Sequence, residues 1–519
     1  MMLRFLLMLP LWLALTTFSQ TTATPQTAAP RQVWDLADEL ELTSTQRDTL
    51  FEIRDSYEAA RAAVRAAAAT NVPPDKLRAA QLNLNDQSRL ANRRIAELLT
   101  SAQKERLTEL RAAERQARVG ATASRTPITD SASSEDANAG ADVDGTPTTR
   151  KVPRKLLSDD DYRNLARELR AAYSQPIANW PTPTLDEDVK PYFEELGLLP
   201  PVVFPTNNPY STAKAELGKK LFFDPRLSGS GQISCSSCHD PDLGFADGRT
   251  VSFGHERLEL KRNAPTILNS AFNTTLFWDG RAGSLEKQAA DVVNNADEMH
   301  SSEHFVYENL NKIPGYRDEF TAAFGSPEVT LERSVQAIAT FERTVTSRGN
   351  KFDTFLRGDT NALSDEALRG LHLFRTDARC ANCHNGPNFT DGKFHNLGLT
   401  YYGRKYQDLG RYEVTKDPAD VGKFKTPSLR NLARTAPYMH NGLFDLDGVL
   451  NMYNAGMPTV RPRANQKNDP LFPVKSPHLQ SLGLNSQDLA DLKAFLESLT
   501  ETRQRMRPPE LPPTLAAQP

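Results

Sequence analysis

The chain has 519 residues, a length that predicts two to four domains. Its 62 Lys and Arg residues nearly balance its 65 Asp and Glu residues, and the net charge of −3 excludes the strongly basic surface of a nucleic-acid-binding protein. Hydrophobic residues make up 39% of the chain, which is enough for one sizeable core with polar linkers beside it.

The N-terminus carries one apolar run, FLLMLPLWLALTTF at residues 5–18, directly behind Arg4. The run is too short to cross a bilayer, but its length is typical of the hydrophobic region of a secretory signal. Small residues at Ala23 and at 28–29 offer cleavage sites. We therefore expect residues 1–23 to be a signal peptide and the mature protein to be periplasmic, with an uncleaved membrane anchor as the alternative.

Residues 31–118 have the periodicity of amphipathic helices. Apolar side chains recur every three or four residues over 50–64 and again over 77–98. The pentapeptides LTSTQ at 42–46 and LTSAQ at 99–103 each place Thr at an N-cap and Gln at N3, which predicts two capping boxes in a helical hairpin. The duplicated motif also resembles the LTxxQ family of small periplasmic helical proteins, although capping alone accounts for it.

The rest of the chain divides by composition. Residues 119–155 are rich in Gly, Ala, Ser, Thr, Asp and Pro, and they predict a disordered linker. Helical patterns then alternate with long loops and no series of alternating strands, so we expect an all-α fold with domains at 158–350 and 351–505. The last helix is predicted to begin near Asn485, and the Pro-rich residues 506–519 are predicted to form a disordered tail.

All four cysteines of the chain lie in C-x-x-C-H pentapeptides. The first holds Cys235, Cys238 and His239, and the second holds Cys380, Cys383 and His384. In such a motif two thiols reach the vinyl groups of one haem and the His binds its iron. A single copy could be a redox C-x-x-C pair or half of a zinc site. Two copies, each followed by a His and with no spare Cys in the chain, disfavour both alternatives. The pattern predicts two covalently bound haem c groups in two cytochrome c-like domains.

Several further motifs occur in the order found in one known family. The chain resembles the bacterial dihaem cytochrome c peroxidase family, which includes the MauG-type enzymes, over roughly residues 195–505. The resemblance is carried by ELGKKLFFDPRLSGSGQISCSSCHDP at 216–241, RNAPTILNSAFN at 262–273, FWDGRAGSLEKQA at 277–289, CANCH, and TPSLRNLARTAPYMHNG at 426–442. It implies that two cytochrome c-like haem domains follow the hairpin and linker.

The resemblance implies catalytic roles for four residues around the first haem. Trp278 matches an electron relay between the haems, while Gln288 and Glu298 match a pair that handles the protons of peroxide. A carboxyl beside the iron can take a proton from one peroxide oxygen and deliver it to the other. His255 matches a distal ligand of the resting haem in the peroxidase members, which the MauG-type members lack. The family stretch N-P-x-E-M reads NADEM at 295–299, so the Pro is lost and the acid is kept.

The resemblance also implies a calcium ion between the haems and a distal ligand at the second haem. The expected calcium ligands are Asn263, Thr435 and Pro437, because Ca²⁺ prefers oxygen donors. At the second haem the peroxidase members use Met and the MauG-type members use Tyr. The stretch MYNAGM at 452–457 offers Tyr453, Met457 and Met452. We favour Tyr453, which would lower the reduction potential of that iron, whereas Met would raise it.

The expected activity is reduction of hydrogen peroxide to water with electrons from a small periplasmic donor, a cytochrome c or a cupredoxin. A MauG-like oxidase that modifies a protein or small molecule is the first alternative, which Tyr453 favours and His255 opposes. A dihaem electron carrier or stress-sensing protein is the second, which Glu298, Gln288 and Trp278 oppose. The sequence leaves open a homodimer.

Overall fold

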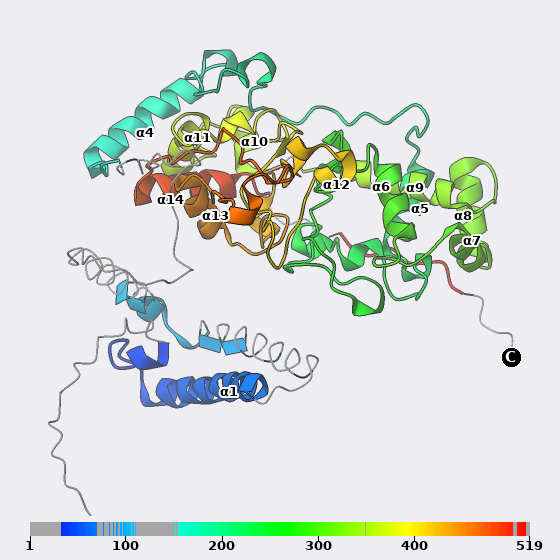
Figure 1. Cartoon of the computed structure of the whole chain (residues 1–519), viewed down its shortest axis with the longest axis horizontal. Coiled ribbons are helices and arrows are strands. Elements are labelled where there is room, and N and C mark those ends of the chain that lie inside the picture. The colour runs from blue at the N-terminus through cyan, green and yellow to red at the C-terminus, as the bar shows by residue number, and fades with distance from the viewer. Residues whose placement is uncertain are drawn as a thin grey trace, which may run out of the picture. The chain divides into compact units, whose positions relative to one another are not determined.

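Figure 1 shows the computed structural model of the chain, which describes residues 33–69, part of 76–110, residue 151, 154–347, 349–501 and 506–514. The expected signal peptide and nearly all of the expected linker lie outside these residues. The chain divides into two compact units, Met1–Glu135 and Asp136–Pro519, which are described separately. Within the described residues, no helix is both long enough and apolar enough to cross a membrane.

The N-terminal unit contains a short 3₁₀ helix, Val33–Leu36, and the helix α1, Ser44–Ala69. The predicted apolar stripe lies within α1, and its members Leu50, Ile53 and Ala60 are buried. Leu50 and Ile53 share a small core with Ile95 and Leu99 from the region of the expected second helix. Much of that second helix lies outside the described residues.

The two L-T-x-x-Q motifs form the predicted capping boxes. Thr43 and Gln46 exchange hydrogen bonds between side chain and backbone, and Thr100 and Gln103 do the same. The two Gln amides also bond to each other, with Gln46 Nε2 2.9 Å from Gln103 Oε1. The duplication therefore caps two helix starts and joins them side by side.

The second unit is built from helices around two separate cores. In chain order its helices are α4 Asp159–Tyr173, α5 Thr212–Phe223, α6 Leu285–Asn294, α7 Glu303–Asn311, α8 Pro314–Phe324, α9 Leu331–Thr344, α10 Lys351–Leu356, α11 Asp365–Arg375, α12 Tyr412–Thr415, α13 Leu446–Asn454 and α14 Ser486–Ser498. The strands β1, Phe394–His395, and β2, Phe424–Lys425, form one short antiparallel pair. This helix-dominated fold agrees with the all-α prediction.

We call the two parts of this unit the first lobe, residues 201–347, and the second lobe, residues 154–200 with 349–501. In Figure 1, α5 to α9 gather in the first lobe, and α4, α10, α11, α13 and α14 gather in the second. The core of the first lobe lies between α5, α8 and α9 and includes Leu217, Phe222, Tyr316, Phe320 and Ile338. α5 and α9 pack backbone to backbone at Gly218, where a Cβ would lie 1.9 Å from the carbonyl oxygen of Ala337.

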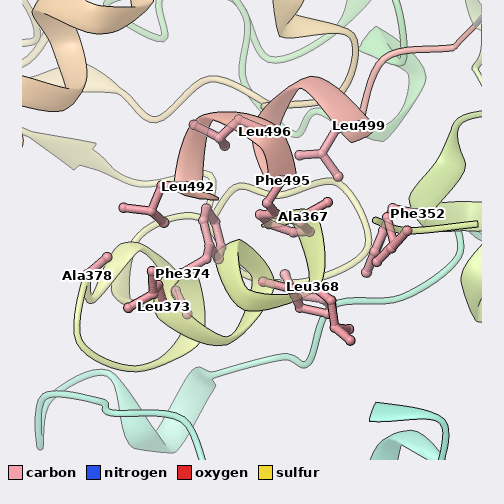
Figure 2. Close-up of a cluster of buried hydrophobic side chains, with 14 of the residues drawn as sticks. Phe352, Ala367, Leu368, Leu373, Phe374, Ala378, Leu492, Phe495, Leu496 and Leu499 are labelled. Atoms are coloured by element: carbon pink, nitrogen blue, oxygen red, sulfur yellow. The ribbon is translucent and has the colours of Figure 1, made fainter. Parts of the chain in front are cut away.

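The core of the second lobe lies between α11 and α14. Figure 2 shows Phe374 and Ala367 of α11 facing Phe495 and Leu492 of α14, with Phe352 of α10 beside them. α14 begins after the N-cap Asn485, as predicted, and its side chains Leu492 and Leu496 pack into this core. Buried ion pairs from Arg369 of α11 to Asp488 and Asp491 of α14 join the polar sides of the same two helices.

Two segments pack elsewhere than the sequence suggested. Leu169, Tyr173 and Leu196 belong to the core of the second lobe, although they precede the first C-x-x-C-H motif and were expected in the domain at 158–350. Residues 506–514 were expected to be a disordered tail, yet Met506 packs against the core of the first lobe and Arg226 donates a hydrogen bond to the carbonyl of Pro512. Burial of short apolar segments by distant elements is the reason for both differences.

Hydrogen bonds and ion pairs join the first lobe to the second. Arg262 of the first lobe binds both carboxylate oxygens of Asp408 in the second, at 2.7 and 2.8 Å. The amide of Lys425 donates to the carbonyl of Trp278, and the amide of Asn263 donates to the carbonyl of His440. These contacts fix the junction between the two lobes, in which Trp278 lies.

Candidate active site

The two C-x-x-C-H motifs fold into the same turn. Each begins with a 3₁₀ helix, Cys235–Ser237 or Cys380–Asn382, and in each the amide of the His lies 2.9 Å from the carbonyl oxygen of the first Cys. All four thiols are free, and burial raises the pKa of Cys238 to about 11 and that of Cys380 to about 12. The four thiols are thus unpaired, and Cys235 and Cys380 pack against the hydrophobic cores of the two lobes.

Each motif His has a ring nitrogen prepared for a metal. His239 Nδ1 lies 3.1 Å from the carbonyl oxygen of Phe245, and His384 Nδ1 lies 3.0 Å from that of Phe389. Because a carbonyl can only accept, Nδ1 carries the proton and the lone pair stays on Nε2. Burial lowers the pKa of both imidazoles, so both are neutral at pH 7.

The predicted acid lies beside the first motif. Glu298 follows α6, and its Oε1 accepts a hydrogen bond from the Asn295 amide at 3.0 Å. Burial raises the pKa of Glu298 above its ordinary value, and the Glu298 charge in turn contributes to the raised pKa of the Cys238 thiol. Gln288 lies half-buried on α6, one turn before Asp291, whose charge also acts on Glu298. Gln288 and Asp291 thus lie on the same face of α6.

His255 lies against the loop that carries Glu298. Its amide donates to the carbonyl of Asp297 at 3.0 Å, and at Gly254 a Cβ would lie 1.9 Å from the same carbonyl oxygen. Only glycine permits this approach. The side chain of His255 is 20% exposed, and its Nδ1 is buried without a hydrogen-bond partner. An unpaired buried ring nitrogen is uncommon and suits an atom that binds a group absent here.

Of the candidate ligands at the second motif, the structure places Tyr453 beside the cysteines. Burial raises the pKa of this phenol above its ordinary value, and the charges of Cys383 and Cys380 raise it further. Met457 is 5% exposed, and its amide bonds back to the carbonyl of Met452 across a tight turn after α13. Asp391 and His395, bonded to each other at 2.8 Å, also lie close to the Cys383 thiol, so the second site has a carboxyl and an imidazole besides the phenol.

Trp278 lies between the lobes. Its Nε1 donates to the carbonyl of Asn263 at 2.9 Å, and its ring meets that of His440 edge to face at 6.4 Å between centroids. His440 also stacks on Phe424, 3.6 Å between centroids. Burial lowers the pKa of His440 to about 4. Sequence reasoning did not single out His440, because an isolated His gives no signal of such packing.

The predicted calcium ligands lie near this junction. The side-chain amide of Asn263 donates to the carbonyl of Arg249 at 2.7 Å, which fixes the orientation of its oxygen. Thr435 and Pro437 lie on the loop that leads to His440, and Thr435 Oγ1 donates to the carbonyl of Leu432 at 3.2 Å. Asn263 and this loop meet through the bond from the Asn263 amide to His440.

One buried carboxyl was also missed. Glu342 of α9 is 3% exposed, and its Oε2 has no hydrogen-bond partner. Burial raises its pKa to about 8, and its charge acts on the Cys235 thiol. A Glu inside an amphipathic helix carries no sequence signal that distinguishes it from a surface residue.

The residues at both motifs fit covalently bound haem. Each site offers two unpaired thiols on one turn and a neutral imidazole oriented through its Nδ1, and one thiol of each turn, Cys235 or Cys380, packs against the core of its lobe. The unpartnered Nδ1 of His255 lies in the first lobe, and the buried phenol of Tyr453 lies beside the second motif. The fold and these sites define a helical protein with two sites for c-type haem.

Comparisons with known proteins agree with this class. The family model of di-haem cytochrome c peroxidase matches residues 212–361. The cytochrome c551 peroxidase of Nitrosomonas europaea is 39% identical over 307 residues, 59% of this chain and 85% of that protein. The methylamine utilization protein MauG of Methylorubrum extorquens is 41% identical over 315 residues, 60% of this chain and 85% of that protein.

A solved structure matches as well. The crystal structure of a MauG-like protein associated with microbial copper homeostasis covers 58% of this chain and 93% of its own, with 35% identity and a TM-score of 0.53. The chain belongs to the di-haem cytochrome c peroxidase family, to which the MauG proteins also belong. The predicted family and the predicted class of enzyme, a peroxidase-type oxidoreductase, are thereby confirmed.

Proposed function

We propose that this enzyme reduces hydrogen peroxide to water at the first haem and receives its electrons through the second. The observation that carries the proposal is the half-buried Glu298, with a raised pKa, beside the Cys238 turn and the His255 loop. Each turnover consumes one H₂O₂, two protons and two electrons and yields two H₂O. The electrons come from a small periplasmic donor, a cytochrome c or a cupredoxin.

Haem would be held by Cys235, Cys238 and His239 in the first lobe and by Cys380, Cys383 and His384 in the second. When bound, its iron supplies the electrons that cleave the O–O bond. The chain supplies orientation through the Nδ1 bonds to Phe245 and Phe389, which fix both imidazole rings.

Glu298 would move the protons. As a carboxylate, it would take a proton from one oxygen of the peroxide, and as an acid it would return that proton to the other oxygen. Burial raises the pKa of Glu298 and favours the acid form, while the hydrogen bond from the Asn295 side-chain amide favours the carboxylate. Gln288, on the same face of α6 as Asp291, would orient the peroxide by hydrogen bonding.

Trp278 would relay electrons between the lobes. Its indole N–H is bonded to Asn263 and its carbonyl to Lys425, so both lobes fix its position. A calcium ion held by Asn263, Thr435 and Pro437 would stabilise the same junction. Residues 1–23 would direct export to the periplasm.

His255 would close the first site in the resting enzyme. Its unpaired buried Nδ1 is suited to an iron, and the loop it belongs to would leave once the second haem is reduced. Such gating requires reduction to bias two loop arrangements differently. Tyr453 would be the distal ligand at the second haem, supported by its position beside Cys383.

A second candidate function is a MauG-like oxidase that modifies a protein or small molecule. The observation that favours it is Tyr453 at the second site, because a tyrosine ligand lowers the reduction potential of an iron. An enzyme of that kind would react with peroxide but would turn over slowly with reduced cytochrome c.

Peroxide turnover by the two-haem protein, with reduced cytochrome c as donor, tests the proposal. We expect turnover that Glu298→Gln removes and that Glu303→Gln, at an exposed position of α7, leaves unchanged. Peroxide consumption that does not occur with reduced cytochrome c, but does occur with a protein substrate, would favour the oxidase. No reaction with peroxide at either haem would exclude both.

A further inference from the structure

The side chain that meets His255 is another histidine. The rings of His255 and His300 lie stacked, with 4.2 Å between centroids and 14° between planes. Such a pair contributes stabilisation beyond the area it buries. His255 Nδ1 has no hydrogen-bond partner, and the stack on His300 is a side-chain contact that orients the His255 ring.

His300 is itself firmly placed. Its Nδ1 donates to the carbonyl of Ala296 at 3.0 Å, and its amide donates to the carbonyl of Asn295 at 2.8 Å. Its φ of 46° is left-handed, which a non-glycine residue adopts at a cost. Gly229 packs on the same turn, where a Cβ would lie 1.9 Å from the His300 carbonyl oxygen. These contacts make the 295–300 turn a rigid base for the His300 ring.

The His255 loop is strained as well, over two successive residues. Glu256 and Arg257, the two residues after His255, have φ values of 51° and 63°. Two successive left-handed residues that are not glycine cost energy, and such strain collects where a segment has a second arrangement. The loop is held at its base by the bond from Gly254 N to Leu258 O and at its tip by the contacts with Asp297 and His300.

The turn that bears both contacts also bears Glu298. Asp297 accepts the His255 amide, His300 stacks on the His255 ring, and Glu298 lies between them in the sequence. The acid and the imidazole at the first site are therefore held on one rigid base. A change at the His300 ring acts on His255 without removing either functional side chain.

We propose that His300 is a positioning residue that holds the His255 ring in place at the first haem site by stacking on it. This inference rests on the proposed role of His255 as the distal group of the resting enzyme. Without the stack, the strained loop leaves more readily, and the first site is open for a larger fraction of the time.

Cyanide affinity of the oxidised two-haem protein tests the proposal, because cyanide and His255 compete for the first site. The apparent dissociation constant falls as the open fraction rises. His300→Ala should bind cyanide roughly five-fold more tightly than the parent, the effect expected for one ring pair. His300→Leu, which fills the space without a ring, should behave like His300→Ala. His300→Phe, which keeps a ring, should resemble the parent.

His304→Ala, at an exposed position of α7, is the matched control and should resemble the parent. His255→Ala gives the limit of a fully open site. If His255→Ala tightens cyanide binding while His300→Ala and His300→Leu do not, the stack has no positioning role and the gating proposal stands. If His255→Ala also leaves the affinity unchanged, His255 does not close the site, and both proposals are overturned. A haem count of two per chain confirms that each variant is loaded.

Discussion

The two haem lobes share one proximal design and differ on the distal side. Each has a C-x-x-C-H turn whose His donates Nδ1–H to a carbonyl five or six residues later. The first lobe adds Glu298 and the loop with His255, and we propose that the acid changes its protonation state and that the loop changes its position. The second adds Tyr453 from the regular helix α13. The comparison indicates that the shared turn accounts for the shared cofactor. The different roles that we propose for the two haems depend on the other residues at each site.

The largest expected effect concerns the C-x-x-C-H turns, which the two lobes share. Replacing Cys235 and Cys238 with Ser, or Cys380 and Cys383 with Ser, should leave one covalent haem per chain in place of two, because no thioether can form at the altered turn. A pyridine-haemochrome assay measures the number. Loss of peroxide turnover is expected in both variants, and two haems retained in either would contradict the assignment of that turn.

The next effect concerns the distal side of the first lobe. Glu298→Gln should lower peroxide turnover by roughly 10²–10⁴-fold while both haems stay bound, since a general acid–base group is lost. Because the pKa of Glu298 is raised and the carboxylate must act first, the parent should lose activity as the pH falls through a value above 4.5. That acid limb should be absent from the residual activity of the variant. A variant within a few-fold of the parent would show that Glu298 has no such role.

His440, at the junction between the lobes, should lower the folding stability of the protein at acid pH. His440 is 5% exposed, and its pKa of about 4 lies below the 6.5 of an unfolded histidine. The unfolded chain therefore binds a proton between these values that the folded chain does not, so His440 costs stability as the pH falls from about 6.5 to about 4. The full cost is roughly 3 kcal/mol. His440→Phe keeps the stack on Phe424 and should lose less stability between pH 7 and pH 4 in urea unfolding; equal losses would refute the assignment.

The smallest expected effect concerns the distal ligand of the second haem. Tyr453→Phe should remove the phenolate signature of the second haem from the resonance Raman spectrum and leave the first haem unchanged. Met457→Leu, close by on the turn after α13, should change neither. A spectrum altered by Met457→Leu alone would assign the ligand to Met457 and make the second site that of an ordinary electron-transfer haem.

The parts of this design that sequence could predict are those with local chemistry. The C-x-x-C-H turns, the capping boxes at Thr43 and Thr100, and the start of α14 at Asn485 each depend on a few adjacent residues. The packing of Leu169 and Met506 depends on partners far along the chain, so composition alone misplaced their segments. The His255–His300 stack was missed for the same reason, since 45 residues separate two histidines that share no motif.

One measurement tests the division of labour most directly: the number of cyanide ions bound by the oxidised two-haem His255→Ala variant. With His255 removed, the first site should be open, while Tyr453 should keep the second closed. A spectrophotometric titration should therefore saturate at one cyanide per chain. Two cyanides per chain would show that Tyr453 does not close the second site, and none would show that the first lobe offers no open site for peroxide.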